Sequence, residues 1–173
     1  MTRVLITYFS QTGNTEKNAR AMHAALKDEC DTREQKLEDV AAGETGGYDF
    51  IFIGTPCIAG DISVQVKDFI GGLPHAPRFR IALFLTHSAP SYRQEDFTKC
   101  IATMETLCGE KSIELVKTFD CQGFLDPRIH DMVKKMKKFS DEEWEKNLAQ
   151  MKGHPDARDE RNAARFAREV VGL

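Results

Sequence analysis

The sequence predicts an α/β protein in which helices cover both faces of a parallel β-sheet. Three apolar runs, over residues 4–9, 48–54 and 80–86, lack the polar alternation of a half-exposed strand and are typical of strands buried on both faces. Helical patterns separate these runs, and alternating strands and helices of such lengths favour a parallel sheet. At 173 residues the chain is long enough for a core of its own, and we expect residues 1–173 to form a single domain.

The first strand, residues 4–9, leads into a helix predicted over residues 14–28. The buried stripe of that helix has helical spacing and consists of Ala19, Met22, Ala25 and Leu26. A weak strand over residues 32–37 is predicted to lie at a sheet edge. A turn-rich stretch then leads to the second strong strand, residues 48–54.

The middle of the chain continues the alternation of strands and helices. A short helix over residues 64–70 ends at a pair of glycines, which are frequent at helix ends. The third buried strand, residues 80–86, is followed by a helix over residues 95–107. A last strand is predicted over residues 113–119.

Only helices are predicted after Pro127. An amphipathic segment comes first, and Ser140 with Glu143 then forms a capping box for a second helix over residues 141–152. Asp156 caps a third helix, whose apolar stripe is that of a helix lying on a sheet. The helix over residues 141–152 is therefore an extra element before the C-terminal helix.

The composition is that of an ordinary globular protein, with 41% hydrophobic and 29% charged residues. No apolar run approaches the about 20 residues of a membrane-spanning helix, so no membrane insertion is expected. The first strand begins directly after Met1, Thr2 and Arg3, which leaves no room for a secretory signal and predicts a cytoplasmic protein.

Five cysteines without a C-x-x-C pair favour free thiols in a reducing compartment over a zinc or iron–sulfur centre, and no metal site is predicted. The net charge is −3. The basic run over residues 134–138 is interpreted as a solvated helix face, because no aromatic residues are interleaved with it. We therefore expect no nucleic-acid partner.

The loop after the first strand is the most informative stretch for function. It consists of Ser10, Gln11, Thr12, Gly13, Asn14 and Thr15. Because it contains no Lys or Arg, its donors are backbone N–H groups and hydroxyls, which converge at a helix N-terminus that favours an anion. The loop is neither a Walker loop nor a G-x-G-x-x-G fingerprint. A phosphate monoester held without a cation is the implied ligand.

This loop, with a strand before it and a helix after it, resembles the phosphate loop of the flavodoxins, where the pattern [ST]-x-T-G-x-T binds the phosphate of FMN. The resemblance covers about residues 3–125 and the last helix. It implies FMN as the cofactor and a flavodoxin-like three-layer sandwich, with five parallel strands in the order 2-1-3-4-5. In that order the ligand lies above the carboxyl ends of the first and third strands, where loops 10–15, 55–61 and 86–93 meet.

The second loop resembles the segment that packs on one face of the flavin ring. The predicted contacts are Thr55, Pro56, Cys57, Ile58, Ala59, Gly60 and Asp61. A glycine at position 60 allows the peptide to flip towards the reduced flavin N5–H, and an ordinary turn is nearly as well supported. Ala59 stands where the family often has an aromatic residue. Cys57 is interpreted as a polarizable filler beside the flavin and not as a reactive thiol, because no base or cation adjoins it in sequence.

The third loop contributes Thr86, His87, Ser88 and Tyr92. Tyr92 is placed like the tyrosine that stacks on the outer face of the flavin in the family. A surface tyrosine at the start of the next helix is an equally good interpretation. Residues 87–90 replace the acidic stretch of many flavodoxins, which implies a less negative second reduction potential.

No catalytic side chains are predicted, because the sequence contains no recognisable triad or carboxylate pair, and the chemistry is assigned to the cofactor. The leading hypothesis is an FMN-binding electron-transfer protein that shuttles electrons between redox partner proteins. The alternative is an NAD(P)H-dependent FMN oxidoreductase of the quinone-reductase type, in which the flavin face left open at Ala59 receives the nicotinamide. A third reading is a flavin-free interaction domain, and the oligomeric state is left open.

Overall fold

A computed structural model describes residues 1–90 and 92–173. Its five parallel strands follow the order β2-β1-β3-β5-β6, and a sixth, β4, pairs only with β3 and runs antiparallel to it. The strands are β1 (Arg3–Tyr8), β2 (Asp31–Lys36), β3 (Phe50–Ile58), β4 (Asp61–Ile62), β5 (Arg80–His87) and β6 (Leu115–Gln122). Apart from the short β4, this is the predicted order 2-1-3-4-5. Residue 91, in the loop predicted over residues 86–93, lies outside the described residues.

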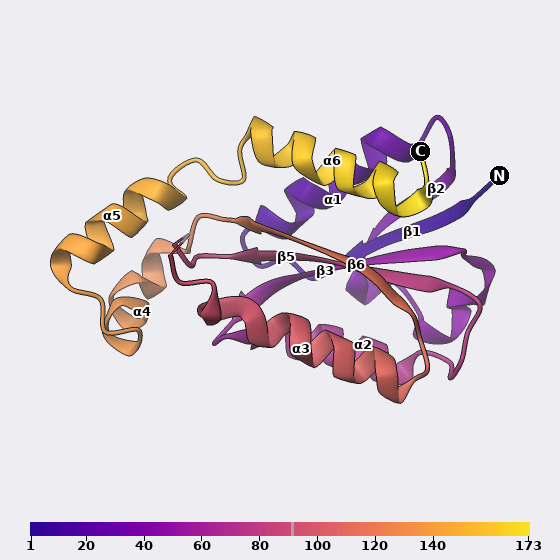
Figure 1. The fold of residues 1–173 in the computed structure, drawn as a ribbon, viewed down its shortest axis with the longest axis horizontal. Helices are drawn as coiled ribbons and strands as arrows, with labels where there is room; N and C mark the ends of the chain where they lie inside the picture. The colour runs from indigo at the N-terminus through magenta and orange to yellow at the C-terminus, as the bar shows by residue number, and fades with distance from the viewer. Residues whose placement is uncertain (91) are drawn as a thin grey trace.

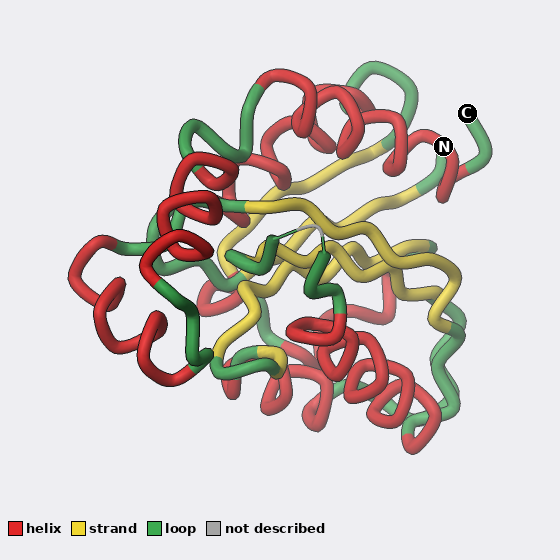
Figure 2. The backbone as a smooth tube through the Cα atoms, turned by 60° about the vertical axis from the view of Figure 1, so that its left-hand side comes forward, coloured by secondary structure: helices red, strands yellow, loops and turns green. Residues whose placement is uncertain are grey.

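Two layers of helices enclose the sheet (Figures 1 and 2). One layer holds α1 (Asn14–Leu26) and α6 (Ala157–Val171), and the other holds α2 (Val64–Gly72) and α3 (Glu95–Glu110). The remaining helices are short or lie apart: η1 (Leu37–Asp39), η2 (Ala42–Gly47), η3 (Pro127–Ile129), α4 (His130–Met136) and α5 (Asp141–Met151). The predicted three-layer sandwich is confirmed. No helix among the described residues is both long and apolar enough to span a membrane.

The core is divided by the sheet into two apolar clusters. Along β1, Val4 and Ile6 belong to the cluster under α1 and α6, whereas Leu5 belongs to the cluster under α2 and α3. All three side chains are fully buried. Successive side chains of a strand point to opposite faces, so a strand buried on both sides consists mainly of apolar residues, as Val4, Leu5 and Ile6 show.

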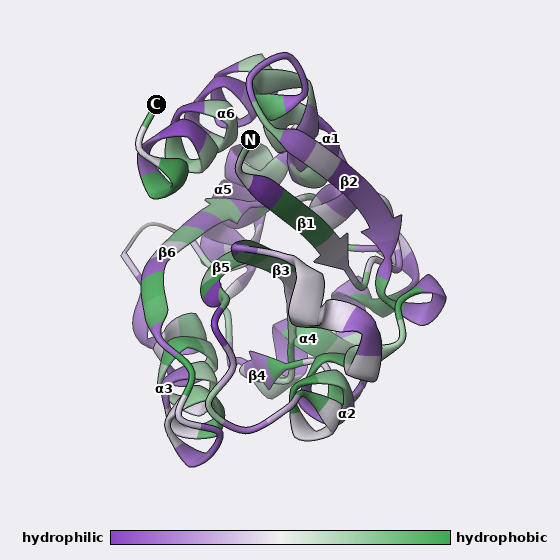
Figure 3. Cartoon of the chain, turned by 90° about the vertical axis from the view of Figure 1, so that its right-hand side faces the viewer, coloured by the Kyte–Doolittle hydropathy of each residue, from purple (hydrophilic) through white to green (hydrophobic). Residues whose placement is uncertain are grey.

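Strand β2 is the edge strand that its weak pattern predicts. Its sequence is polar and its residues are exposed or only partly buried, in contrast to β1 and β3, as the colouring of Figure 3 shows. Charged side chains on an edge strand discourage pairing with another chain. The polar sequence of β2 suits an edge position, and the same polarity makes the strand hard to recognise from the sequence.

We call residues 127–151 the arm. It includes η3, α4 and α5 and lies beyond the carboxyl ends of the strands (Figure 1). Trp144 is buried and packs against Phe139 and His130, with ring centroids 5.6 and 5.5 Å away. The predicted capping box of Ser140 and Glu143 begins α5. The extra helix is therefore part of a small aromatic-centred unit at the edge of the sheet where the parallel strands have their carboxyl ends.

Candidate functional site

A cleft of about 280 Å³ opens at the carboxyl ends of β1, β3 and β5 and is bounded on one side by the arm. Most of the residues that the sequence predicts for the site line this cleft. They are Ser10, Gln11, Thr12, Asn14, Thr15, Pro56, Cys57, Ile58, Ala59, Gly60, Thr86, His87 and Ser88. The three predicted loops therefore meet at one place, as expected for a ligand site at the strand-order reversal of such a sheet.

Four predicted residues do not line the cleft: Gly13, Thr55, Asp61 and Tyr92. Gly13 shapes the first loop, and the buried hydroxyl of Thr55 accepts the backbone N–H of Ser63 at 3.0 Å. The Tyr92 side chain is 55% exposed. A direct role of these residues in ligand binding stays a prediction.

Asp61 instead lies directly after the turn of the β3–β4 hairpin and forms ion pairs. Its carboxylate lies 2.8 Å from the Lys67 ammonium and 3.2 Å from that of Lys99. Burial alone would raise the pKa of Asp61, but hydrogen bonds from Lys67, Thr103, Lys99 and the Ile62 N–H outweigh it and lower that pKa. The Asp61 carboxylate therefore forms ion pairs with Lys67 of α2 and Lys99 of α3.

The end of the cleft at α1 has the features of an anion site. Gly13 precedes the helix with φ +87°, and its N–H donates to the Ser10 hydroxyl at 3.1 Å. No side chain caps α1, so the first N–H groups of the helix keep their bonding capacity for a ligand. Asn14, at the start of the helix, is fixed by a 2.9 Å hydrogen bond from its amide to the Phe124 carbonyl.

Behind this end of the cleft, the hydroxyls of Thr15 and Thr86 share a buried hydrogen bond of 2.8 Å. One hydroxyl must donate to the other, which leaves one of the two protons for a further acceptor. Thr15 is 1% and Thr86 3% exposed, and both residues line the cleft. The pair is therefore a donor fixed in position by the strand β5 and the helix α1.

Residues 58–61 form a tight hairpin within the loop that the sequence predicts over residues 55–61. Ile58 pairs with Asp61, so Ala59 and Gly60 are the two central residues of the turn. Their φ values are +52° and +82°, and positive φ at both central positions is what a type I′ turn requires. The ordinary turn considered for this stretch is thus present, whereas the two-residue strand β4 was not predicted, because so short a strand leaves no periodic pattern.

We expect Gly60→Ala to lower the free energy of unfolding by about 1 kcal/mol, because an L-residue resists the left-handed conformation that this turn position requires. Ala59→Gly is the matched control, since it relieves the same strain at the neighbouring position and is expected to leave stability unchanged or higher. Urea unfolding of both variants tests this. Equal losses in the two proteins would contradict the assigned turn.

The arm and the segment after β6 add lining residues that the sequence did not indicate. They are Gly123, Phe124, Leu125, Asp126, Ile129, Met132, Val133, Met136, Lys137, Phe139 and Asn147, together with Ala89 and Asp96 near the start of α3. The segment 123–126 follows a strand end, so the rule that ligands lie at carboxyl ends could have found it. Nothing local in the arm signals its contact with the cleft.

The apolar lining comes from two separate elements. Ile58 of the hairpin is 38% exposed, and Met132 and Met136 of the arm are 57% and 53% exposed, yet all three line the cleft. Exposed apolar side chains gathered at one cleft are the usual sign of a ligand surface. The arrangement suits a flat apolar group with an anionic tail at α1.

His87 is the titratable group nearest the end of β5. Its ring stacks on Phe97, with centroids 3.9 Å apart, and its Nε2 lies 3.2 Å from a carboxylate oxygen of Asp120. Nδ1 is buried and has no hydrogen-bond partner among the described residues. These contacts hold the imidazole rigidly beside the cleft.

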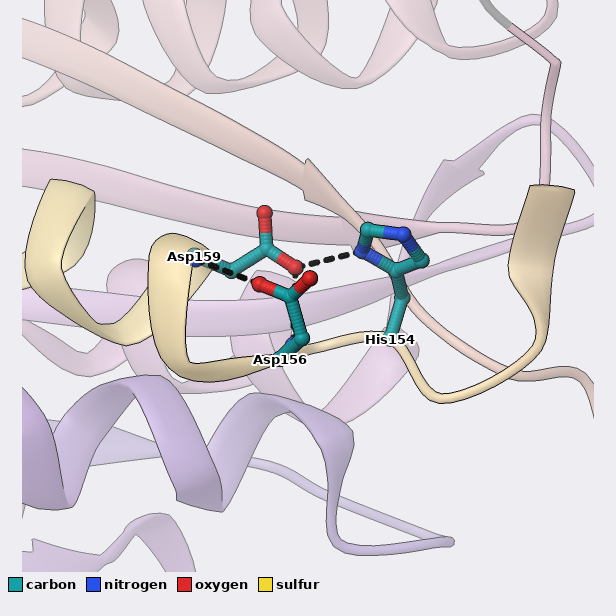
Figure 4. A group of neighbouring side chains, drawn as sticks. All are labelled: His154, Asp156 and Asp159. Atoms are coloured by element: carbon teal, nitrogen blue, oxygen red, sulfur yellow. Dashed lines mark hydrogen bonds and ion pairs between the residues drawn. The ribbon is translucent and has the colours of Figure 1, made fainter.

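A cluster of His154, Asp156 and Asp159 has the composition of a metal site (Figure 4). Its hydrogen bonds identify it as the start of α6. Asp156 accepts the N–H groups of Arg158 and Asp159, while the Asp159 carboxylate accepts the Asp156 N–H and lies 2.6 Å from His154 Nδ1. A reciprocal capping box explains this group without a metal ion.

The strand order, the uncapped helix after the first strand and the cleft at the carboxyl ends together define the flavodoxin-like class of α/β proteins. The chain belongs to the Flavodoxin domain family, whose model matches residues 5–168.

Comparison with individual proteins agrees with this assignment. The chain is 26% identical to the flavodoxin-like domain-containing protein BilS of Clostridioides difficile (strain CD3), over 96% of this chain and 95% of BilS. Its fold is similar to that of Megasphaera elsdenii flavodoxin, with a TM-score of 0.57, 22% identity and coverage of 68% and 84% of the two chains. It is also similar to an azoreductase from Bacillus anthracis str. Sterne, with a TM-score of 0.59, 13% identity and coverage of 98% and 100%. At these identities the structural matches show the fold alone.

Proposed function

We propose that residues 1–173 form one domain that binds FMN in the cleft and carries electrons between redox partner proteins. The uncapped N-terminus of α1, which opens at one end of an apolar cleft, is the observation that carries this proposal. Flavodoxins are flavin-binding proteins, and the chain belongs to their family. When bound, FMN supplies one- and two-electron redox chemistry.

The residues present suit the two chemically different halves of FMN. Around the N-terminus of α1, Ser10, Thr12 and Thr15 offer hydroxyls and backbone N–H groups to the phosphate. Ile58 of the hairpin and Met136 of the arm offer apolar contacts to the ring system. In this proposal Met132 and Met136 of the arm cover the face of the flavin ring that an aromatic residue at position 59 would otherwise cover.

The size of the cleft supports a carrier over an enzyme. Its volume of about 280 Å³ is slightly smaller than the roughly 300–1,000 Å³ that ligand pockets occupy. One flavin would fill such a space, so a nicotinamide stacked on the ring would require the arm to move. Electron transfer to a partner protein needs only an exposed edge of the flavin, because no second small molecule has to bind inside the cleft.

The alternative function is an NAD(P)H-dependent FMN oxidoreductase, and one observation favours it. Helix α4 has no buried residue and presents Met132 and Met136 at the cleft, so a modest displacement of the arm would expose apolar surface for a second ring. Both functions predict a yellow protein. They differ in whether a reduced nicotinamide reacts with it directly.

Purified protein reconstituted with FMN is expected to bind one flavin and to be bleached slowly by NADH or NADPH under anaerobic conditions, with a rate that does not saturate with nicotinamide concentration. A chemically reduced redox protein should bleach it much faster. Absorbance at the flavin maximum measures both reactions. Fast, saturable bleaching by either nicotinamide would establish the oxidoreductase instead, and a protein that takes up no FMN would leave a flavin-free interaction domain.

A further inference from the structure

A polar side chain of the arm lies in the part of the cleft that is otherwise apolar. Asn147 belongs to α5 and lines the cleft, and only 2% of the residue is exposed. The other arm residues of the lining are apolar except for Lys137, whose ammonium is paired with the Asp96 carboxylate. A buried amide in such surroundings needs hydrogen-bond partners, because an unpaired polar group is costly to bury.

The contacts of Gln122 fix which way the Asn147 amide faces. Gln122 of β6 lies 3.2 Å from the Ala89 carbonyl, which can only accept a hydrogen bond, so the Gln122 atom at this contact is the donor Nε2. The same Nε2 lies 3.5 Å from Asn147, and the Asn147 atom that faces it is therefore the acceptor Oδ1. This leaves Nδ2 on the opposite side of the Asn147 amide.

The Nδ2 atom of Asn147 is a donor without a protein acceptor. It donates to none of the described residues, yet it is not sealed in the interior as the unpartnered Oδ1 of Asn18 is. Because Asn147 is almost fully buried and lines the cleft, the cleft is the space from which Nδ2 can be reached. A fixed amide donor beside an apolar surface is suited to orient a ligand through a carbonyl oxygen.

We propose that Asn147 donates a hydrogen bond to a carbonyl oxygen of the flavin ring and thereby sets the orientation of the ring. This inference rests on the proposed binding of FMN. Gln122 ties Asn147 to Ala89, which belongs to the loop expected to pack on the ring, and not to loop 10–15, where the phosphate is proposed to lie. The ring has carbonyl oxygens at one end and only methyl groups at the other. The extra helix α5 thus brings a specificity-determining residue to the cleft.

Titration of the apoprotein with FMN, riboflavin and lumiflavin tests this contact, because lumiflavin keeps the ring but lacks the ribityl chain and the phosphate. Asn147→Leu should weaken the binding of all three flavins by about tenfold, since they share the ring and lose the same hydrogen bond. Asn147→Asp keeps an acceptor for Gln122 but removes the Nδ2 donor, and it should weaken all three at least as much. Gln150→Leu is the matched control and should bind as the parent does, because Gln150 is exposed on the same helix and is not among the described residues that line the cleft.

Two further measurements separate this contact from a structural role of Asn147. Trp144 is the only tryptophan of the chain and is buried in the arm, so its fluorescence reports whether the arm is packed normally in each variant. A hydrogen bond to a ring carbonyl moves the ¹³C resonance of that carbonyl downfield. With FMN labelled at its ring carbonyls, this shift should be lost in both Asn147 variants while the Trp144 emission is unchanged.

The possible results have distinct meanings. Unchanged flavin affinities in both Asn147 variants overturn the inference and leave the proposed function intact. A loss confined to FMN and riboflavin also overturns it, because Asn147 would then contact the ribityl chain, and a loss confined to FMN would place the contact at the phosphate. A parent protein that binds none of the three flavins overturns the proposed function together with this inference.

Discussion

Riboflavin is expected to bind this protein at least about 100-fold more weakly than FMN. The two ligands differ only in the phosphate, which the proposal places at the uncapped N-terminus of α1. Each charge-assisted hydrogen bond to a buried phosphate contributes about 1.5–3 kcal/mol, so the loss of two or more such bonds costs at least about 3 kcal/mol. A factor of ten in affinity corresponds to about 1.4 kcal/mol. Flavin fluorescence titrations of the apoprotein with both ligands measure the ratio.

Substitution of Thr15 tests whether the start of α1 is responsible for the difference in affinity between FMN and riboflavin. Thr15→Val keeps the shape of the side chain but removes a hydroxyl whose partner is Thr86, 2.8 Å away. FMN affinity should fall about tenfold or more, while riboflavin affinity should change little. Thr106→Val is the control, because Thr106 is exposed on α3 and its hydroxyl contacts only a helix carbonyl. Equal affinities of the parent for FMN and riboflavin would remove the phosphate assignment altogether.

The parts of the site that the sequence predicted are those coded by local pattern. The run over residues 4–9 is apolar except at Thr7 because both faces of β1 are buried, and the polar loop follows directly at the carboxyl end where this sheet can bind a ligand. Strand, loop and helix are contiguous, so no knowledge of distant contacts is needed. The same reasoning places the ends of β3 and β5 at the cleft.

The rest of the site depends on contacts between distant segments. The arm reaches the cleft because Lys137 pairs with Asp96 and because the Arg93 guanidinium lies over the ring of Phe139, 4.5 Å from its centroid, and no periodicity encodes either contact. The interpretation of Cys57 as a filler rested on its sequence neighbours. The Lys137 charge that helps to lower the pKa of Cys57 and the Asp96 carbonyl 3.7 Å from its sulfur come from distant segments, which only the folded chain brings near this residue.

Gly54 of β3 packs directly against Phe84 and against Thr15 of the anion site, so a larger residue at this position should strongly reduce stability. Gly54→Ala should lower the free energy of unfolding by about 3 kcal/mol or more and weaken FMN binding as well. A β-carbon at this position would lie 2.3 Å from two ring atoms of Phe84 and 2.8 Å from a methyl group of Thr15. Phe84 is fully buried, so its ring has no open space to enter, and overpacking of a dense core typically costs about 1–3 kcal/mol even when the contacts are less severe.

The methyl group that Gly54→Ala introduces would displace Thr15 as well as Phe84. The substitution should therefore lower stability in urea unfolding, and it should weaken FMN binding in titrations of the protein that remains folded. Gly109→Ala is the control, since a β-carbon there meets no atom within 4 Å and a helical glycine replaced by alanine usually gains about 0.5–1 kcal/mol. A Gly54→Ala protein as stable as the parent would mean that Phe84 and Thr15 can separate freely. In that case the hydroxyl pair behind the cleft is not held in place by packing, and the affinity of the anion site must come from the backbone N–H groups of α1 alone.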